Sequence, residues 1–164
     1  MDATIRWALV TAIAPIAWVR RVLDYAVTQV PSTKIQVGVP ADGRDWPTTT
    51  AGCPVDNMPA RDRYTSAEAL AGAKDKGKTA EWDSTYMERT FSYNKTYTGE
   101  NAIGDPVSCT IKRTVWFEEN SAAIRRARLV GEYKLAGISQ WTVGGEDPKQ
   151  WSRIEDYALS ISKV

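Results

Sequence analysis

The sequence has no histidine, and only two of its 164 residues are cysteines. Without histidine, the chain lacks the side chain that most often transfers protons near neutral pH and most often binds metals. Two cysteines are too few for a structural zinc site. We therefore expect no metal and no cofactor, and any acid–base chemistry must come from carboxylates or tyrosines.

The sequence also lacks an excess of charge of either sign, because 21 basic residues face 20 acidic ones. No basic block stands out, which argues against nucleic acid and against a membrane surface as partners. A short apolar stretch near the N-terminus lacks the basic start and the cleavage site of a signal peptide. It is too short and too interrupted to span a bilayer. We interpret it as a loop leading into a helix.

What the chain does contain is enough apolar sequence, 43%, to form a core in one domain or in part of a larger one. Its seven tryptophans either pack in that core or, where exposed, stack on flat ligand faces such as sugars. Cys53 and Cys109 form one disulfide or remain two buried thiols. The sequence favours the disulfide, which suits an exported protein.

The first part of the chain has the pattern of a helix followed by a buried strand. Pro15 suits a first helical turn, and Pro31 ends the helix. Apolar residues recur between them at helical spacing, and we expect these to face the core: Val19, Val22, Leu23, Ala26, Val27 and Val30. Residues 34–40, "KIQVGVP", predict a strand of a parallel sheet. The following "ADGRDWPTTT" is rich in turn formers and predicts a loop.

The middle of the chain differs in character. Residues 47–64 look irregular, and Thr65 with Glu68 has the spacing of a capping box that starts a short helix. "STYMERTFSYNKTY" and "TIKRTVWFEE" are rich in aromatic and β-branched residues, which predicts antiparallel strands. We interpret this part as a small α+β insertion.

The last part returns to the first pattern. Asn120 or Ser121 is expected to cap a helix that ends near Lys134, and "ISQW" predicts a strand. Asp147 is expected to cap a final helix, with Pro148 in its first turn. The inner face of that helix is predicted to hold Trp151, Ile154, Tyr157, Ala158 and Ile161. The alternation of helices and strands indicates an α/β fold with right-handed crossovers.

Four stretches together resemble the C-terminal part of family-18 glycoside hydrolases, in the branch acting on chitin-like and peptidoglycan-type amino sugars. They are "APIAWVRRVLDYAVTQVPSTKIQVGVPADGRDW", "EWDSTYMERTFSY", "RTVWFEENSAAIRRARLVGEYKLAGISQW" and "GGEDPKQW". The resemblance implies the C-terminal portion of a (β/α)8 TIM barrel with an α+β insertion. Residues 1–46 would supply a barrel helix and the seventh strand, residues 47–119 the insertion, and residues 120–164 the last barrel helix, the eighth strand and a C-terminal helix.

The resemblance also implies a reaction. In that family a glutamic acid protonates the glycosidic oxygen and the N-acetyl group of the sugar attacks the anomeric carbon, which gives retaining, substrate-assisted hydrolysis. This glutamic acid closes a D-x-x-D-x-D-x-E run, which is absent here. We therefore assign no catalytic residue to this chain and expect it alone to be inactive. Two alternatives are a non-catalytic carbohydrate-binding member of the family and a stable fragment without activity.

One site residue matches the family well. Its eighth strand ends in a tryptophan that forms the floor of the subsite where the bond breaks, and Trp141 holds this place in "GISQW". In the seventh strand Asp42 replaces an aromatic residue. Arg44 and Trp46 follow as candidate rim residues. Glu146 is a candidate to bond a sugar hydroxyl, or else a solvated surface charge.

These implications set the expected partners. The ligand would be an amino-sugar polysaccharide, and the protein would be located outside the cell or in the cell wall. A quarter of a barrel exposes strand edges and inner helix faces. We therefore expect the chain to associate with the missing N-terminal barrel portion or with itself.

Overall fold

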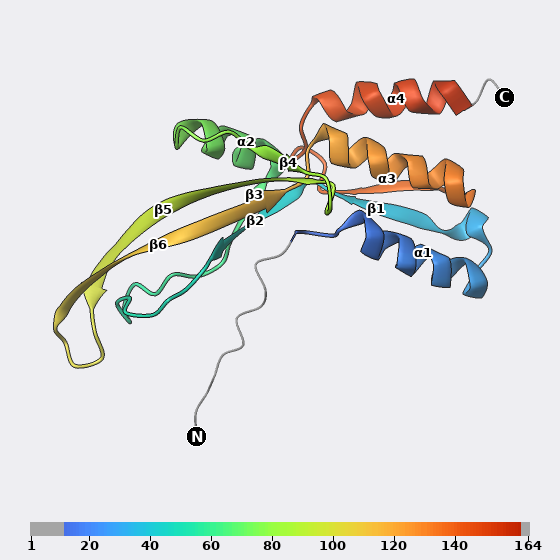
Figure 1. Cartoon of the computed structure of the whole chain (residues 1–164). Helices are drawn as coiled ribbons and strands as arrows, with labels where there is room; N and C mark the ends of the chain where they lie inside the picture. Colours follow the sequence, from blue (N-terminus) through green and yellow to red (C-terminus); the bar gives the residue numbers. More distant parts are fainter. Residues whose placement is uncertain (1–11, 162–164) are drawn as a thin grey trace.

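The computed structural model describes residues 12–161, which form a mixed α/β fold with two sheets (Figure 1). In the smaller sheet, β1 (Gln36–Pro40) pairs in parallel with β7 (Gly137–Trp141). The larger sheet is antiparallel. In sheet order its strands are β3 (Asp62–Thr65), β2 (Asp42–Pro47), β6 (Pro106–Phe117), β5 (Glu88–Glu100) and β4 (Glu81–Asp83). The expected N-terminal loop falls mostly outside the described residues.

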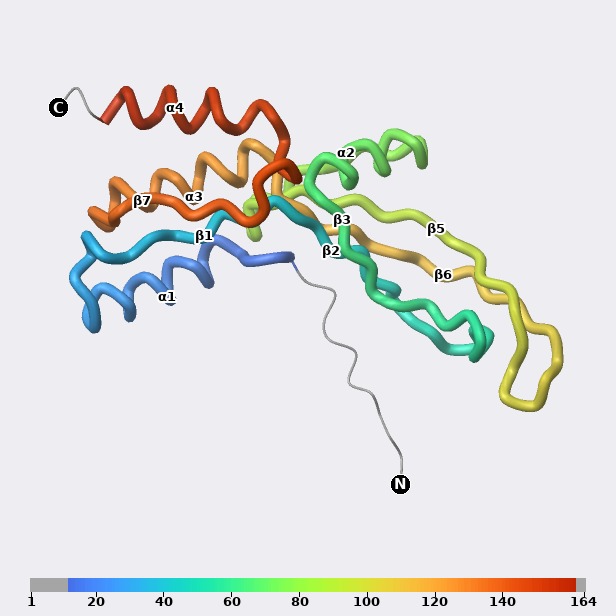
Figure 2. Tube along the Cα trace, turned by 180° about the vertical axis from the view of Figure 1, so that it is seen from behind, coloured from blue at the N-terminus to red at the C-terminus, as the bar shows by residue number. Residues whose placement is uncertain are grey.

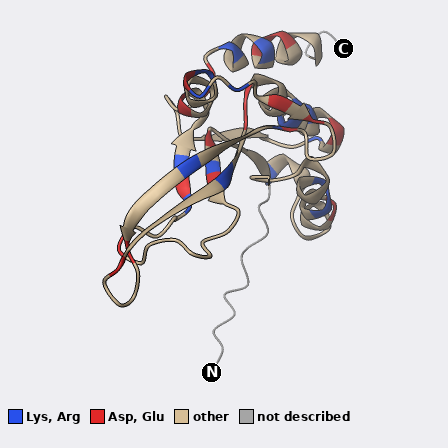
Figure 3. Cartoon of the chain, turned by 60° about the vertical axis from the view of Figure 1, so that its left-hand side comes forward, with Lys and Arg blue, Asp and Glu red and all other residues tan. Residues whose placement is uncertain are grey.

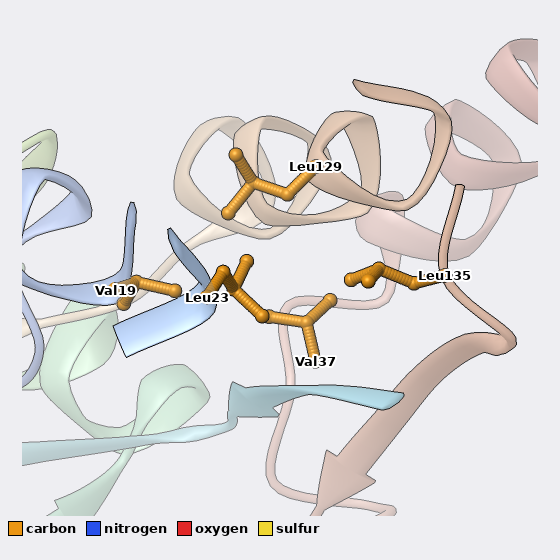
Figure 4. Close-up of a cluster of buried hydrophobic side chains, with 5 residues drawn as sticks. All are labelled: Val19, Leu23, Val37, Leu129 and Leu135. Carbon is orange, nitrogen blue, oxygen red and sulfur yellow. The ribbon is translucent and has the colours of Figure 1, made fainter. Parts of the chain in front are cut away.

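Helix α1 (Ile16–Gln29) forms where the periodicity predicts it, directly after Pro15. Its buried residues Val19 and Leu23 pack against Val37 of β1 and against α3 (Asn120–Tyr133), as Figure 4 shows. Two predicted core residues are exposed instead: Val22 by 44% and Val30 by 42%. Val22 lines a groove along β1, where no further strand pairs within the described residues.

The last two helices lie on one side of the parallel pair, with α4 (Lys149–Ile161) outside α3 (Figures 1 and 2). Glu119, rather than Asn120 or Ser121, is the N-cap of α3, because its extended backbone lets its carboxylate accept the N–H of Ser121 at 3.0 Å. Among residues 12–161, none of the helices combines the length and the apolarity needed to cross a membrane.

The predicted inner face of α4 is only partly covered. Ile154 and Tyr157 are half-buried, but Trp151, Ala158 and Ile161 are exposed. Helix α4 makes its main contact with α3, and one neighbouring helix cannot cover a broad apolar face. The expectation that all five residues pack inward is therefore wrong for three of them.

Residues 42–47, predicted as a loop, form strand β2 instead. Turn-forming residues are accepted there because β2 has a strand on each side, β3 and β6, so its backbone is hydrogen-bonded along both edges. Only Ala41 separates β1 from β2. Strand β2 thus joins the antiparallel sheet although most of it lies inside the predicted barrel segment 1–46. The predicted boundary between barrel and insertion at residue 46 stays a prediction.

Helix α2 (Ser66–Asp75) begins at the capping box that the sequence predicts. The Thr65 hydroxyl accepts the Glu68 N–H at 3.1 Å, and the Glu68 carboxylate accepts the Thr65 N–H at 2.7 Å. Ala69 and Ala73 of α2 pack against one face of the antiparallel sheet. That face therefore forms the core of this part of the molecule.

A buried ion pair joins β2 to β6. Arg113 donates from Nε to Asp45 at 2.9 Å, and both side chains are fully buried. Tyr93 and Tyr97 complete the network through their hydroxyl groups. Burial and the neighbouring Asp45 carboxylate raise the pKa of Tyr93, so Tyr93 remains a hydrogen-bond donor. Losing either ionic partner would leave an uncompensated buried charge.

A disulfide between Cys53 and Cys109 ties the loop after β2 to β6, across a sequence separation of 56. We expect the Cys53→Ser, Cys109→Ser double variant to lose about 4 kcal/mol of unfolding free energy, because a closed loop of this length restricts the unfolded chain. Urea denaturation measures this loss. Reducing agent should lower the stability of the wild type and leave the double variant unchanged, and equal stabilities without reductant would contradict the prediction.

Candidate functional site

The carboxyl ends of the two parallel strands meet at Pro40 and Trp141, which are partners in the strand register. The Ala41 N–H donates to the Trp141 carbonyl at 2.6 Å, which fixes this end of the pair. The Trp141 side chain is 70% exposed. Because side chains alternate along a strand, Trp141 shares one face of the sheet with Ser139 and Gly38, which are also exposed.

The turn after Trp141 explains the glycine-rich acidic sequence. Gly144 has φ +93°, which favours glycine, and a Cβ on Gly145 would come within 3.1 Å of the Ala41 carbonyl oxygen. The Glu146 carboxylate accepts the Gly144 N–H at 2.5 Å and the Trp151 indole N–H at 2.8 Å. These bonds, led by the indole, lower the pKa of Glu146.

Asp147 starts α4 as predicted, since its carboxylate accepts the Lys149 N–H at 3.0 Å. It also accepts the side-chain amide of Asn120 at 2.6 Å. The turn is thereby tied to the start of α3 as well as to α4. A built-in hydrogen-bond network thus holds the backbone that follows Trp141.

Three of the candidate residues lie along one side of the next strand. Asp42, Arg44 and Trp46 alternate along β2, so they share a face of the antiparallel sheet. Arg44 pairs with the Asp42 carboxylate, and the Arg63 Nε of β3 forms a salt bridge with the same carboxylate at 3.0 Å. This carboxylate is 8% exposed, whereas the two arginines are 24% and 54% exposed.

A second group of acids is buried where the two sheets meet. Arg126 of α3 donates from Nε to Glu118 at 2.8 Å and lies 3.6 Å from Glu88. Glu88 in turn accepts the backbone N–H groups of Ile13 and Ala14 at 2.7 and 2.8 Å. Burial raises the pKa of Glu88, although these N–H groups oppose the shift. Burial likewise raises the pKa of Glu118 to about 7, against the effect of Arg126.

The structure therefore brings Trp141 beside the end of β1 and places Asp42, Arg44 and Trp46 on the strand that continues from it. Glu146 lies in the turn, where an indole and a backbone N–H already bind its carboxylate. Its predicted contact with a sugar stays a prediction.

Sequence reasoning missed Arg63, Glu88, Glu118 and Arg126. Only the sheet register could have shown that Arg63 faces Arg44, because the two residues are 19 positions apart along the chain. The buried acids carry a weak signal: Glu118 directly follows the apolar end of β6, where a buried charged residue needs a partner, and Glu88 begins β5. Nothing in the local sequence identifies Arg126 as that partner.

The arrangement is suited to binding. Trp141 offers an exposed ring, and Arg44 of β2 and Arg63 of β3 offer N–H donors. Asp42 and Glu146 are both engaged in the contacts described above. Within residues 12–161, no group of three or more acidic or cysteine side chains is placed to hold a metal ion.

No protein-family model matches the chain. Among curated proteins, the cortical fragment-lytic enzyme of Bacillus cereus is 31% identical over 150 residues, which are 91% of this chain and 31% of that protein. The enzyme of the same name from Bacillus subtilis is 29% identical over 155 residues, 93% of this chain and 32% of that protein. The chain thus spans about a third of the length of the curated relatives it matches.

Solved structures of a cortex-lytic enzyme and of a chitinase are also similar to this chain. The spore cortex-lytic enzyme SleL of Bacillus cereus superposes with a TM-score of 0.70 at 27% identity, over 93% of this chain and 32% of that one. A chitinase from Chromobacterium violaceum gives a TM-score of 0.68 at 28% identity, over 91% of this chain and 40% of that one. The mixed α/β fold is therefore similar to chitinase-like domains.

The raised pKa of Glu118 makes stability depend on pH. This carboxyl group titrates near pH 4.5 when unfolded and near 7 when folded. Its contribution to the free energy of unfolding is thus fully present below pH 4.5 and is lost as the pH rises through about 7. We expect that free energy to fall by about 1–3 kcal/mol from pH 5 to pH 7.5, measured by urea denaturation.

The Glu118→Gln variant should show a smaller fall over this range, with the remainder due to Glu88, whose pKa is also raised. Glu155→Gln is the matched control, since Glu155 is exposed on α4. An identical pH dependence in wild type and Glu118→Gln would contradict the assignment.

Proposed function

We propose that this chain, which resembles the C-terminal portion of family-18 glycoside hydrolases, is the part of such an enzyme that holds N-acetylated amino-sugar polymers of chitin or peptidoglycan type. Its similarity to cortex-lytic enzymes and chitinases supports a glycoside hydrolase directed at cell wall or chitin. The complete enzyme would carry out retaining, substrate-assisted hydrolysis. Its catalytic acid would come from outside this chain.

The observation that carries the proposal is the placement of Trp141. Its ring stands 70% exposed at the carboxyl end of a parallel strand. Active sites of barrel enzymes lie at this end of the strands. An exposed indole can pack against the apolar face of a sugar ring, and this contact would help hold the sugar in a distorted form. The rigid turn after Trp141 fixes the backbone that carries the ring.

The two sheets fit the proposed barrel. Strands β1 and β7 would be the seventh and eighth barrel strands, with α1 and α3 on the outer face. The antiparallel sheet and α2 would be the insertion between the seventh strand and its helix, close to the proposed division at residues 47–119. The parallel pairing and the position of α3 between β6 and β7 support this assignment.

An open flank beside β1 suggests where the rest of the barrel would bind. A groove of about 380 Å³ runs between α1 and β1 and is mostly apolar. Trp18, 52% exposed, and Val22 line it. A strand paired on one edge also leaves half of its backbone groups without a strand partner. The proposed occupant is the remaining barrel portion, with self-association of this chain as the alternative.

The proposed setting is the extracellular space or the cell wall. The similar proteins are named for lysis of the spore cortex, and this supports a setting outside the cytoplasm. The Cys53–Cys109 disulfide fits an oxidising compartment.

A non-catalytic carbohydrate-binding protein is the second candidate. The exposed Trp141 ring is compatible with it, because a binding protein needs the ring but no catalytic acid. Glycan binding without bond cleavage by the complete protein would distinguish it from the hydrolase.

In the complete protein, the Trp141→Ala substitution should weaken binding of an N-acetylglucosamine oligosaccharide by more than about tenfold, which corresponds to a loss of about 1.4 kcal/mol or more of stacking and burial of the ring. Isothermal titration calorimetry measures the affinity. Tyr25→Ala serves as a control, since Tyr25 is 69% exposed on α1. Unchanged affinity in a folded Trp141→Ala variant would remove this residue from the site.

The open flank predicts that the purified chain self-associates at micromolar concentration or binds a hydrophobic dye. Val22→Asp should lower both signals, because a charge in the groove opposes apolar contact. Ile103→Asp is the control, since Ile103 is 83% exposed and does not line the groove. Sedimentation and dye fluorescence provide the readouts, and a sharply melting, dye-free monomer would contradict the prediction.

A further inference from the structure

Helix α4 buries a polar side chain and leaves apolar ones at the surface. Gln150, in the first turn of the helix, is 2% exposed and is the only buried residue among the described positions 149–161. The charged residues of the helix, which carry both signs, are exposed (Figure 3). Trp151 and Ile161 are exposed by 39% and 46%. Burying an amide costs free energy that burying an apolar side chain does not, so packing alone does not explain Gln150.

The Gln150 side chain is paired with a second amide. Its Nε2 donates to the Oε1 of Gln140 at 2.8 Å. Gln140 lies in β7 directly before Trp141. Because side chains alternate along a strand, Gln140 points away from the face that carries the Trp141 ring and shares its face with Ile138, which packs against the core between the helices and β1. The amide pair therefore joins α4 to the back of the strand end that carries the ring.

This pair is a poor source of stability. The Nε2 of Gln140 is buried and has no hydrogen-bond partner among the described residues. Leaving a buried donor unsatisfied can cost as much as a paired hydrogen bond contributes, and two apolar side chains of the same shape would avoid that cost. What the pair provides is a fixed distance and orientation between β7 and α4, because a hydrogen bond is directional.

The end of β7 needs such a contact because the sheet holds it on one edge only. Strand β7 pairs with β1, and no other strand in the described part of the chain pairs with it. The register partner of Trp141 is Pro40, which has no backbone N–H to donate. The Ala41 N–H, just beyond β1, bonds to the Trp141 carbonyl instead. Contacts from outside the sheet therefore help to set the position of this strand end.

Two successive residues of α4 hold the chain on both sides of Trp141. Gln150 bonds to Gln140 just before the ring, and the Trp151 indole N–H donates to Glu146, five residues after it, at 2.8 Å. The bond to Gln140 is partly buried, whereas the bond to Glu146 is exposed. Water competes less with the partly buried bond, so the amide pair is the firmer of the two constraints.

We infer that Gln150, acting through Gln140, is a positioning residue that sets where the Trp141 ring stands relative to a bound amino sugar. The inference rests on the proposed function, because it requires that a sugar packs on Trp141. Stacking needs the ring at a narrow range of distances and tilts, and a displacement of about 1 Å is enough to weaken a site of this kind.

The test replaces both amides by methionine, which is unbranched and similar in length to glutamine but has no N–H. In the complete protein, the Gln140→Met, Gln150→Met variant should bind the N-acetylglucosamine tetramer about fivefold more weakly than the wild type, measured by isothermal titration calorimetry. Its melting temperature should equal or exceed that of the wild type, because the unsatisfied buried donor is removed. A purely structural contact would not give weaker binding at undiminished stability.

A matched control separates this effect from the loss of any glutamine. Gln29→Met, at an exposed position in the last turn of α1, should change neither the affinity nor the melting temperature.

A double-mutant cycle shows whether the pair acts through the ring. When Trp141→Ala is already present, the two methionine substitutions should weaken binding by less than about 1.5-fold, because the ring that they would displace is gone. A fivefold loss that persists without the ring would mean that the pair acts by another route, and it would overturn the inference.

The remaining outcomes separate the inference from the proposed function. Wild-type affinity in the Gln140→Met, Gln150→Met variant, together with weakened binding by Trp141→Ala, overturns the inference and leaves the proposed function standing. A lower melting temperature in the methionine variant makes the pair a stabilising contact and also overturns the inference. Unchanged affinity in a folded Trp141→Ala variant removes the sugar contact of the proposed function, and the inference with it.

Discussion

The side chain of Arg126 is almost fully buried where the two sheets meet, and its guanidinium contacts three separate segments. It donates to Glu118 just after β6, approaches Glu88 at the start of β5, and donates to the Ala14 carbonyl before α1. A buried cation is stable only when such partners surround it, since an unpaired buried charge costs several kcal/mol. The orientation of the parallel pair relative to the antiparallel sheet therefore depends on this contact.

That orientation has consequences for the ligand surface. With the sheets fixed, the single residue Ala41 carries the chain from β1 into β2. The exposed ring of Trp141 lies beside the end of β1, and the salt-bridged Asp42 and Arg44 follow on β2. In the proposed function, the parallel pair would supply the stacking contact to the sugar.

Local patterns predicted several elements whose stability is largely local. Helix α1, the capping box of α2 and the start of α4 at Asp147 follow from periodicity and from hydrogen bonds within a few residues. The apolar run of β1 also predicted a strand, although its partner β7 lies far along the chain. The same reasoning was wrong for residues 42–47, where turn-forming residues adopt a strand because β3 and β6 bond both of its edges. It also placed Val22 and Trp151 in a core, although few neighbouring segments reach them.

The sequence by itself determined the order of the helices, the parallel strands β1 and β7, the candidate ring at Trp141 and the lack of a histidine-based site, because composition and short-range spacing carry that information. The tertiary structure alone decided which charges meet. Arg63 reaches Asp42 through a strand register, and Arg126 reaches Glu88 through the packing of a helix on a distant strand. Such contacts join residues that are far apart along the chain, and no local pattern records them.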